Sequence, residues 1–460
     1  MTIAANLAAR LEGVVGSSRV LASEAELLGY AIEDCLPAAA VRPSCSEEVC
    51  EVVRFAAAEK LGVVCCGSRS KLQMGMQAQR YDVALDLCAL AQIAHYDEAD
   101  LTLSVDAGMR LEALSKVLAA KRQFVPLAVP CLATSTVGGS VVSGIDSMLR
   151  LQYGTARDFL VGAEFVDGTG RTCKSGGRVV KNVTGYDIHK LLIGSLGTLA
   201  AITRLNFRTF PLPETSAGAL TGFSSAEAAL AFRRELLGSG LPFSCVELFD
   251  GQFSSLLDGE LGRLKDLGFA PLKAGGWSLY TAFAGEEAVV RRMKSEVENR
   301  SARAAAKSFE MLEEQRNEWL GDALRESFDW LRHAARGVVI VRISQKQFAT
   351  QGPKLFLSNP SSSGWRSALL MSGSGTVMLA LLPEEENESG REEMLCSVRE
   401  ILAQGNTGEN TAKLLHAPAW VKAHCNVWGD LRGDFLLMQR VKAAFDPARV
   451  FSPGRFVGGI

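Results

Sequence analysis

The chain has 460 residues, a length that predicts two or three domains. Its 49 Lys and Arg residues against 51 Asp and Glu residues give a formal net charge of −2, which argues against a nucleic-acid-binding protein, because such proteins present a clustered basic surface. Hydrophobic residues make up 47% of the chain and charged residues 22%, so a sizeable folded core is expected and global disorder is not.

Helix-like and strand-like patterns alternate in the first part of the chain. An amphipathic helix is predicted at 5–15, and a second helix after Pro43, where 44–46 can cap it and two glutamates lie in its first turn. A third helix is predicted at 111–120. Apolar runs of strand length lie at 61–66, 83–87, 101–105, 160–166 and 198–207.

Pro211 and Pro213 then interrupt the chain and indicate a domain boundary. Beyond it the sequence predicts helices at 226–237, 286–307 and 394–404, and strands at 245–249, 277–283, 338–343 and 376–382. A charged linker is expected at 383–393, and a last helix ends at Phe445 before the tail DPARVFSPGRF. Strands and helices mixed in this order favour an α+β domain.

The eleven cysteines include no C-x-x-C pair, so the ligand spacing of a zinc ribbon or a ferredoxin-type cluster is absent. We interpret them as free thiols of a reducing compartment. Arg10 and Glu12 interrupt the apolar start of the chain, so no secretory signal is expected. The longest uncharged stretch, 123–145, has the prolines and glycines of a loop rather than a membrane span. A soluble, cytoplasmic protein is predicted.

Three glycine-containing segments carry the pattern of a ligand site. The first, CGSRSKLQMG at 66–75, follows a predicted strand, where successive N–H groups of a tight turn can hold a phosphate. It has the spacing of neither a P-loop nor G-x-G-x-x-G, and alone it is better explained as a surface turn. The second, 133–144, places hydroxyls beside Gly138-Gly139, and the third covers 176–187 and 194–198. Together they indicate one large cofactor laid across loops.

The region from Arg42-Pro43 to Pro213 resembles the FAD-binding domain of the PCMH-type flavoproteins, the vanillyl-alcohol oxidase superfamily. Within it, GRVVKNVTGYD at 177–187 and GSLGTL at 194–199 are similar to the FAD-binding E subunit of bacterial glycolate oxidase, and so is the tail at 437–456. The resemblance implies an α+β fold. The chain is then expected to have an N-terminal helical segment at 1–34 and a PCMH-type FAD-binding domain at 35–213. An α+β cap domain with an antiparallel sheet is expected at 214–434, followed by a C-terminal segment at 435–460 that returns to the FAD domain.

The resemblance also implies non-covalently bound FAD, with its pyrophosphate on the 67–71 turn and at 136–139, and the flavin and ribityl chain along Ser143, Gly144, Asp158 and Ile202. The implied cofactor-binding residues are Gly67, Ser68, Arg69, Ser70, Lys71, Gly75, Thr134, Thr136, Gly138, Gly139, Ser143, Gly144, Asp158, Lys181, Asn182, Gly185, Tyr186, Gly197 and Ile202. Covalent attachment is not expected, because the 67–71 turn contains no histidine.

The sequence departs from the family pattern at two places. Ser68 and Arg69 stand where the turn is usually glycine-rich, which weakens a close backbone approach, while Arg69 can add a charge contact to a phosphate. Ser452-Pro453-Gly454 stands where the family usually has Asn-Pro-Gly, so one amide contact is lost. No metal site is expected, because the family's H-x-G-D-G-N-x-H motif is absent and His416 and His424 form no recognisable pair.

The implied function is that of the FAD-binding subunit of a glycolate oxidase-type 2-hydroxy-acid dehydrogenase, whose flavin accepts a hydride from the α-carbon or relays electrons to a partner subunit. This chain has no cluster ligands, and the resemblance implies a larger FAD subunit and an iron–sulfur subunit as its partners. Any membrane association is expected through those partners only. Two alternatives stay open: a stand-alone FAD-dependent dehydrogenase for D-lactate or another hydroxy acid, and a non-catalytic assembly subunit, which Ser68 and Arg69 favour.

Four further residues are weighed as candidates for the site. Arg342, in the predicted strand at 338–343, is a candidate to bind a substrate carboxylate, and the alternative is a structural ion pair. His189 lies within the third glycine-containing region and is interpreted as structural. Lys181 and Asn182 suit either a turn or contacts to the flavin, and the resemblance favours the contacts.

Overall fold

The computed structural model describes residues 3–177, 185–260, 276–345, 364–384, 387–407 and 410–460. The chain divides into two compact units. Unit 1 comprises Met1–Asp146, Thr155–Leu212 and Leu431–Ile460, and unit 2 comprises Ser147–Gly154 and Pro213–Asp430. The domain boundaries proposed from the sequence stay predictions.

Unit 1 contains a small, mainly parallel sheet with the strand order β1-β2-β4-β3. Its strands are β1 (Val20–Leu21), β2 (Ala39–Val41), β4 (Val83–Asp86) and β3 (Val63–Cys66). The parallel strands are almost wholly apolar, as expected of strands covered on both faces. Helices α1 (Ile3–Val15) and α3 (Ser46–Ala58) contribute Leu11, Val49 and Val53 to the same buried cluster as Val63. The helices predicted at 5–15 and after Pro43 are confirmed.

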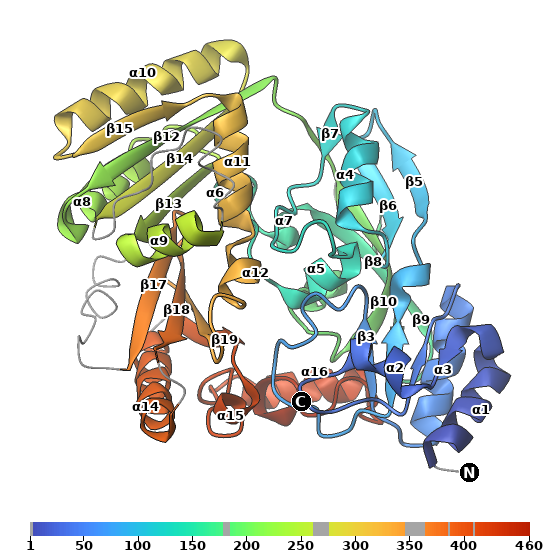
Figure 1. Cartoon of the computed structure of the whole chain (residues 1–460). Helices are drawn as coiled ribbons and strands as arrows, with labels where there is room; N and C mark the ends of the chain where they lie inside the picture. The colour runs from blue at the N-terminus through green and yellow to red at the C-terminus, as the bar shows by residue number, and fades with distance from the viewer. Residues whose placement is uncertain (1–2, 178–184, 261–275, 346–363, 385–386, 408–409) are drawn as a thin grey trace. The chain divides into compact units, whose positions relative to one another are not determined.

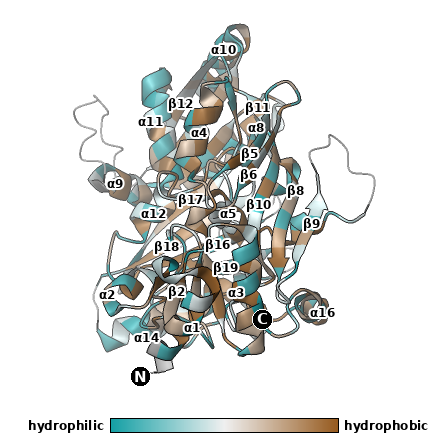
Figure 2. Ribbon diagram, turned by 90° about the vertical axis from the view of Figure 1, so that its right-hand side faces the viewer, coloured by the Kyte–Doolittle hydropathy of each residue, from teal (hydrophilic) through white to brown (hydrophobic). Residues whose placement is uncertain are grey.

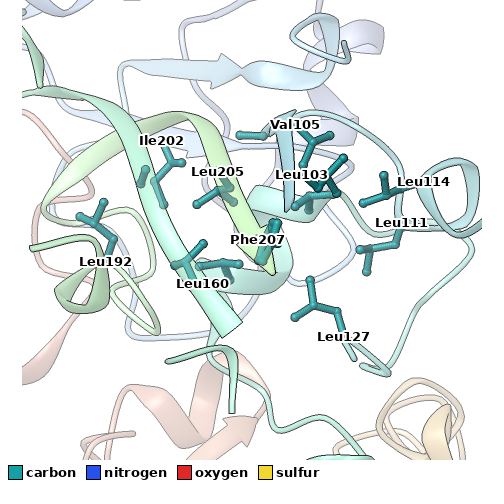
Figure 3. Packing of buried hydrophobic residues seen from close by; sticks show 14 of the residues in the cluster. Leu103, Val105, Leu111, Leu114, Leu127, Leu160, Leu192, Ile202, Leu205 and Phe207 are labelled. Carbon is teal, nitrogen blue, oxygen red and sulfur yellow. The ribbon is translucent and has the colours of Figure 1, made fainter. Parts of the chain in front are cut away.

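The second sheet of unit 1 is antiparallel, with the order β5-β6-β10-β8-β9. Its strands are β5 (Ile93–Asp97), β6 (Thr102–Asp106), β10 (Ala200–Arg208), β8 (Leu160–Asp167) and β9 (Thr172–Gly176). Leu205 and Phe207 of β10 lie directly opposite Val105 and Leu103 of β6, so their side chains share one face. That face packs against α4 (Leu111–Ala119) and α5 (Val137–Ser143). Figure 3 shows Leu111 and Leu114 of α4 beside the strand residues.

The remaining elements of unit 1 are short, apart from the last helix. They are η1 (Ser17–Arg19), α2 (Glu24–Leu27), η2 (Leu28–Tyr30), η3 (Leu87–Ala89), the antiparallel pair β7 (Gln123–Phe124) and β11 (Phe210–Pro211), α7 (Ala156–Phe159), η4 (Ile188–Leu191), α16 (Phe435–Phe445) and η6 (Val457–Gly459).

The C-terminal residues complete unit 1 through a buried ion pair. The ammonium of Lys442, on α16, donates to the Asp446 carboxylate at 2.7 Å and to the backbone carbonyls of Thr198 and Phe451 at 2.6 and 2.9 Å. The same carboxylate accepts from the amides of Val450 and Phe451. Phe451 then bridges to Val63 of β3 in parallel fashion, so the tail lies along the edge of the small sheet.

Unit 2 contains an eight-stranded antiparallel sheet with the order β15-β12-β14-β13-β17-β18-β16-β19. These strands are β15 (Ser308–Leu312), β12 (Thr215–Phe223), β14 (Trp277–Gly285), β13 (Cys245–Asp250), β17 (Trp365–Ser372), β18 (Thr376–Pro383), β16 (Val339–Ser344) and β19 (Thr411–His416). The predicted α+β class with an antiparallel sheet is therefore confirmed (Figure 1).

Unit 2 also contains eight helices within the described residues: α6 (Arg150–Tyr153), α8 (Ala226–Gly238), α9 (Gly251–Glu260), α10 (Glu287–Arg303), α11 (Glu314–Arg325), α12 (Ser327–Leu331), α14 (Glu388–Gly405) and α15 (Ala419–Lys422). α10 lies along β12 and β15, and the mixture of hydrophilic and hydrophobic residues along it is visible in Figure 2. Of the helices in the described ranges, none combines the length and the hydropathy needed to cross a bilayer.

The helix predicted at 394–404 begins six residues earlier, at Glu388, so the prediction of a linker reaching residue 393 was wrong. The reason is a capping interaction: the Asn387 side chain accepts a hydrogen bond from the amide of Gly390 at 2.8 Å and starts the helix inside the charged run. The helix predicted at 286–307 ends at Arg303, four residues early, because β15 begins at Ser308.

Unit 2 holds a buried carboxyl group at the centre of its sheet. Glu247 of β13 is 3% exposed and lies directly opposite Tyr280 of β14 and Ser372 of β17. Burial raises the pKa of Glu247 to about 8, while a hydrogen bond from Ser372 and the charge of Arg233 oppose the shift. The guanidinium of Arg233 donates to the Ser372 carbonyl at 2.6 Å, so the charged partner is fixed nearby.

This carboxyl group should make the stability of unit 2 pH-dependent. Between pH 4.5 and 8 the unfolded chain ionises Glu247 while the folded chain keeps it protonated, so stability falls as pH rises, by up to about 1.4 kcal/mol per pH unit. The glutamine of Glu247→Gln is uncharged in both the folded and the unfolded chain, so the stability of this variant should not show this fall with pH. The measurement is the melting temperature of both proteins at pH 5 and pH 8. If the melting temperatures of the two proteins changed by the same amount between pH 5 and pH 8, Glu247 would not be the group responsible.

The Lys442–Asp446 pair should stabilise unit 1 strongly. Lys442→Met leaves a buried carboxylate without its positively charged partner and removes the Lys442 donor from two carbonyls, which should cost about 3–5 kcal/mol in the free energy of unfolding measured with urea. The control is Lys116→Met, which removes an exposed lysine from a pair with Glu112 at the same spacing of four residues and should cost less than about 0.5 kcal/mol. Equal costs for the two variants would show that the buried pair has no special role.

Candidate functional site

A pocket in unit 1 lies between the 67–71 turn, which follows β3, and the start of α5. Eight residues predicted from the sequence line it: Gly67, Ser68, Arg69, Ser70, Lys71, Thr136, Gly139 and Ser143. The structure therefore brings the first and second glycine-containing segments to one site, although 65 residues separate Ser70 from Ser135, whose hydroxyl oxygens lie 3.2 Å apart.

The turn approaches α5 so closely that residue 67 must be glycine. A Cβ atom on Gly67 would lie 2.2 Å from Oγ1 of Thr136, far inside contact distance. Thr136 cannot yield easily, because its Oγ1 accepts a hydrogen bond from the amide of Gly139 and caps α5. Gly138 is equally restricted, since a Cβ there would lie 2.7 Å from the Cβ of Ala107.

Two cationic side chains of the pocket have defined partners. The Lys71 ammonium donates to the hydroxyl of Ser135, beside the start of α5. The Arg455 guanidinium, contributed by the C-terminal segment, donates to the carbonyls of Leu72, Met74 and Met76, which follow the turn. Burial lowers the pKa of Arg455 to about 10, so it stays charged at neutral pH.

The thiols beside the turn are unreactive. Burial raises the pKa of Cys65 to about 12 and the pKa of Cys66 well above its ordinary value, so both are neutral at physiological pH. A neutral buried thiol is a poor nucleophile. The pocket therefore has the chemistry of a binding site: among the residues that the structure describes, its lining carries hydroxyls, close backbone, a lysine and two arginines, but no carboxylate. That donor set fits a phosphate-containing ligand.

Sequence reasoning missed seven lining residues: Cys65, Cys66, Leu72, Met74, Val142, Leu196 and Arg455. Leu196 and Arg455 lie inside segments that carry the family resemblance, so the motifs contained a signal for them. Cys66, Leu72, Met74 and Val142 lie inside the first and second glycine-containing segments, but their apolar side chains gave no reason to place them at a ligand site.

Nine other predicted cofactor-binding residues, all within the described ranges, lie outside the lining of this pocket. The Asp158 carboxylate accepts from the amide and hydroxyl of Thr155 and caps α7. Ile202 is 3% exposed in the core cluster, and Tyr186 is 88% exposed. Gly75, Thr134, Gly138, Gly144, Gly185 and Gly197 also do not line it. Lys181 and Asn182 lie outside the described residues. The assignment of all these residues to the cofactor stays a prediction.

Arg342 belongs to unit 2. It lies on β16, directly opposite Met378 of β18 and Lys413 of β19. His189 in unit 1 is buried, and its Nδ1 lies 3.0 Å from the hydroxyl of Ser175, which also accepts from the His189 amide. Burial lowers the pKa of His189, so the ring is neutral and links η4 to β9.

Comparison with known families agrees with this geometry. The profile of the "FAD binding domain" family matches residues 37–176, which include the whole pocket wall from β3 to α5. The profile "FAD linked oxidases, C-terminal domain" matches 212–344 and 432–456. The chain belongs to the PCMH-type FAD-linked oxidoreductases. FAD is therefore its cofactor, and the donor set of the pocket suits the phosphates of that molecule.

Curated relatives share part of their length with this FAD-linked oxidoreductase. It is 26% identical over 215 residues to the glycolate oxidase subunit GlcD of Bacillus subtilis, covering 47% of this chain and 46% of the relative. It is 30% identical over 221 residues to the glycolate oxidase subunit GlcE of Escherichia coli, covering 48% and 62%. D-2-hydroxyglutarate dehydrogenase of Xanthomonas citri is 31% identical over 204 residues, covering 44% and 43%. The matches thus span about half the length of each protein.

Solved structures show the same fold over nearly the whole chain. p-Cresol methylhydroxylase with substrate bound has a TM-score of 0.74 at 16% identity, covering 99% of this chain and 97% of the other. 4-Ethylphenol oxidase from Gulosibacter chungangensis has a TM-score of 0.72 at 16% identity, covering 98% and 96%. At this identity the likeness concerns the fold alone.

Gly67→Ala should weaken FAD binding. The added methyl group forces Thr136 away from the amide of Gly139, so the turn and α5 separate, and we expect a loss of about tenfold in affinity and about 1–3 kcal/mol in stability. FAD content after purification and fluorescence titration of the apoprotein measure the effect. The control is Gly13→Ala in α1, where a Cβ meets nothing within 4 Å and alanine favours the helix. Unchanged FAD affinity in Gly67→Ala would refute the close approach.

Proposed function

We propose that the chain is the FAD-binding subunit of a glycolate oxidase-type 2-hydroxy-acid dehydrogenase, an FAD-dependent oxidoreductase that acts on CH–OH groups. The observation that carries the proposal is the pocket of unit 1, which suits a phosphate-containing cofactor and lies in the region matched by the FAD binding domain family. Relatives named as glycolate oxidase subunits support the substrate class.

The pocket residues fit the pyrophosphate of FAD. The Gly67–Lys71 turn and the start of α5 at Thr136–Gly139 present close backbone and hydroxyl groups, and Lys71 supplies a positive charge beside Ser135. We expect non-covalent binding, because the turn has no histidine and the neighbouring thiols are neutral. When bound, FAD supplies two-electron redox chemistry, here the acceptance of a hydride from the α-carbon of the substrate.

We propose Arg342 as the residue that binds the substrate carboxylate. Arg342 lies directly opposite Lys413 across the β16–β19 pair, so two cationic side chains occupy neighbouring positions of the sheet. The Lys413 ammonium lies 5.4 Å from the centre of the Trp428 ring. A guanidinium can bind a carboxylate through two parallel hydrogen bonds, which suits the carboxylate of a hydroxy acid.

The proposed partners are a larger FAD subunit and an iron–sulfur subunit, which would take the electrons onward, and we expect a cytoplasmic location. The relatives named as subunits support a multi-subunit assembly. A second candidate is a stand-alone dehydrogenase for a D-hydroxy acid, favoured by the relatives named D-2-hydroxyglutarate dehydrogenase and D-lactate dehydrogenase. The third is an assembly subunit without catalysis of its own.

The visible absorption spectrum of the purified chain tests these candidates. An oxidised-flavin spectrum that bleaches with anaerobic glycolate or D-lactate identifies a dehydrogenase and its substrate. A flavin spectrum that neither acid bleaches supports electron relay to a partner subunit. A colourless protein that does not take up added FAD would contradict the proposal and leave the assembly role.

Arg342→Met should raise KM for the hydroxy acid about 10- to 100-fold and leave the dissociation constant of FAD unchanged, because a charge-assisted bond to the carboxylate is lost. The matched control is Arg366→Met on β17, which removes an exposed arginine paired with Glu384 at 3.4 Å. Steady-state kinetics and FAD titration of both variants make the comparison. A KM as low as that of the control would rule Arg342 out.

A further inference from the structure

A cluster of four side chains lies directly behind the 67–71 turn. At its centre is Asp86, the last residue of β4, which is 1% exposed and lies opposite Cys66 in the parallel register. Its carboxylate accepts from the hydroxyl of Tyr30 at 2.6 Å and from the guanidinium groups of Arg42 and Arg69, both at 3.1 Å. One buried carboxylate thus holds three donors that come from separate parts of unit 1.

Arg69 is the member of this cluster that belongs to the turn. Its φ is +67°, a left-handed conformation that glycine adopts freely and other residues adopt at a cost. Its side chain is held on two sides, by the Asp86 carboxylate and by the Tyr30 ring, whose centre lies 4.4 Å from the guanidinium carbon. A left-handed conformation is thus held here by the contacts of an arginine side chain.

The N-terminal residues also contact the part of the chain that follows the turn. Gln73 Nε2 donates to the carbonyl of Ala31, and Gln73 Oε1 accepts from the amide of Glu33, both at 2.9 Å. The Tyr81 hydroxyl donates to the carbonyl of Tyr30. These residues of 30–33 precede the region matched by the FAD binding domain family, which begins at residue 37.

We propose that Arg69 is a positioning residue for FAD: anchored by Asp86 and Tyr30, it holds the 67–71 turn in its binding conformation, and the segment 30–33 forms a brace behind that turn. This inference rests on the proposed binding of FAD at the turn. It differs from direct contact between the Arg69 guanidinium and a phosphate, in which Arg69 would act through its own charge.

Substitution of Asp86 separates the two roles, because they predict opposite signs. If Arg69 contacts the phosphates directly, Asp86→Asn removes a competing negative charge near an anionic ligand and should leave FAD affinity equal or higher. If Arg69 acts through its anchor, Asp86→Asn releases the turn and should lower FAD affinity about tenfold, a loss equivalent to one hydrogen bond between charged groups.

The experiment is fluorescence titration of each apoprotein with FAD, together with its melting temperature. Arg69→Gly, which keeps the left-handed turn accessible but removes the anchor, should also bind FAD about tenfold more weakly, and the double variant no more weakly than either single one. The matched control is Arg10→Gly, because Arg10 likewise pairs with a carboxylate, Glu59, and lies over a ring, Phe55, away from the turn.

Equal or tighter FAD binding by Asp86→Asn, or unchanged binding by Arg69→Gly, overturns the proposal. If Asp86→Asn does not fold, Tyr30→Phe is used in its place, because it keeps the ring and removes only the hydrogen bond to Asp86. FAD affinity should then fall a few fold. Unchanged FAD affinity in Tyr30→Phe would contradict the proposed brace. Failure of the proposed function is distinguishable, because then the unmodified chain itself takes up no FAD.

Discussion

The buried ammonium of Lys442 is the interaction on which unit 1 depends. It joins the carbonyls of Thr198 and Phe451 and the carboxylate of Asp446, so residues far apart in the sequence share one charged group. Its desolvation is unfavourable, and burial lowers its pKa, but the three acceptors offset that cost. The fixed tail then places Arg455 against the carbonyls that follow the 67–71 turn. One ion pair therefore supports the wall of the cofactor pocket.

The pocket depends on glycines, whose missing side chains let backbone segments approach closely, more than on a set of side chains that contact the ligand. Gly67 and Gly138 allow the turn, α5 and β6 to approach within distances that any Cβ would prevent. Close backbone can then contact an anion, and Lys71, beside Ser135, is one of the positively charged side chains on the pocket wall. At Arg69, where the turn has no glycine, the ion pair with Asp86 and the contact with the Tyr30 ring hold the left-handed backbone conformation.

Sequence alone predicted the features that depend on local pattern. The α+β class, the FAD cofactor and the residues of two glycine-containing segments followed from motifs, and the structure brings those two segments to one pocket. The anchoring of Arg69 was not predictable, because it depends on Tyr30 and Asp86, which reach the turn only through the packing of the small sheet. Strand β12, TSAGALTGF, was missed because its small residues lack a strand pattern, and nine register pairs with β14 define it instead.

The order of the units along the chain has a consequence for biosynthesis. Residues 213–430 form most of unit 2 and are inserted between two parts of unit 1. A ribosome therefore completes the eight-stranded sheet before it delivers Lys442 and Arg455, the residues that close the cofactor pocket. A chain that ends before residue 442 therefore lacks both the buried ion pair and the arginine that the C-terminal segment contributes to the pocket wall.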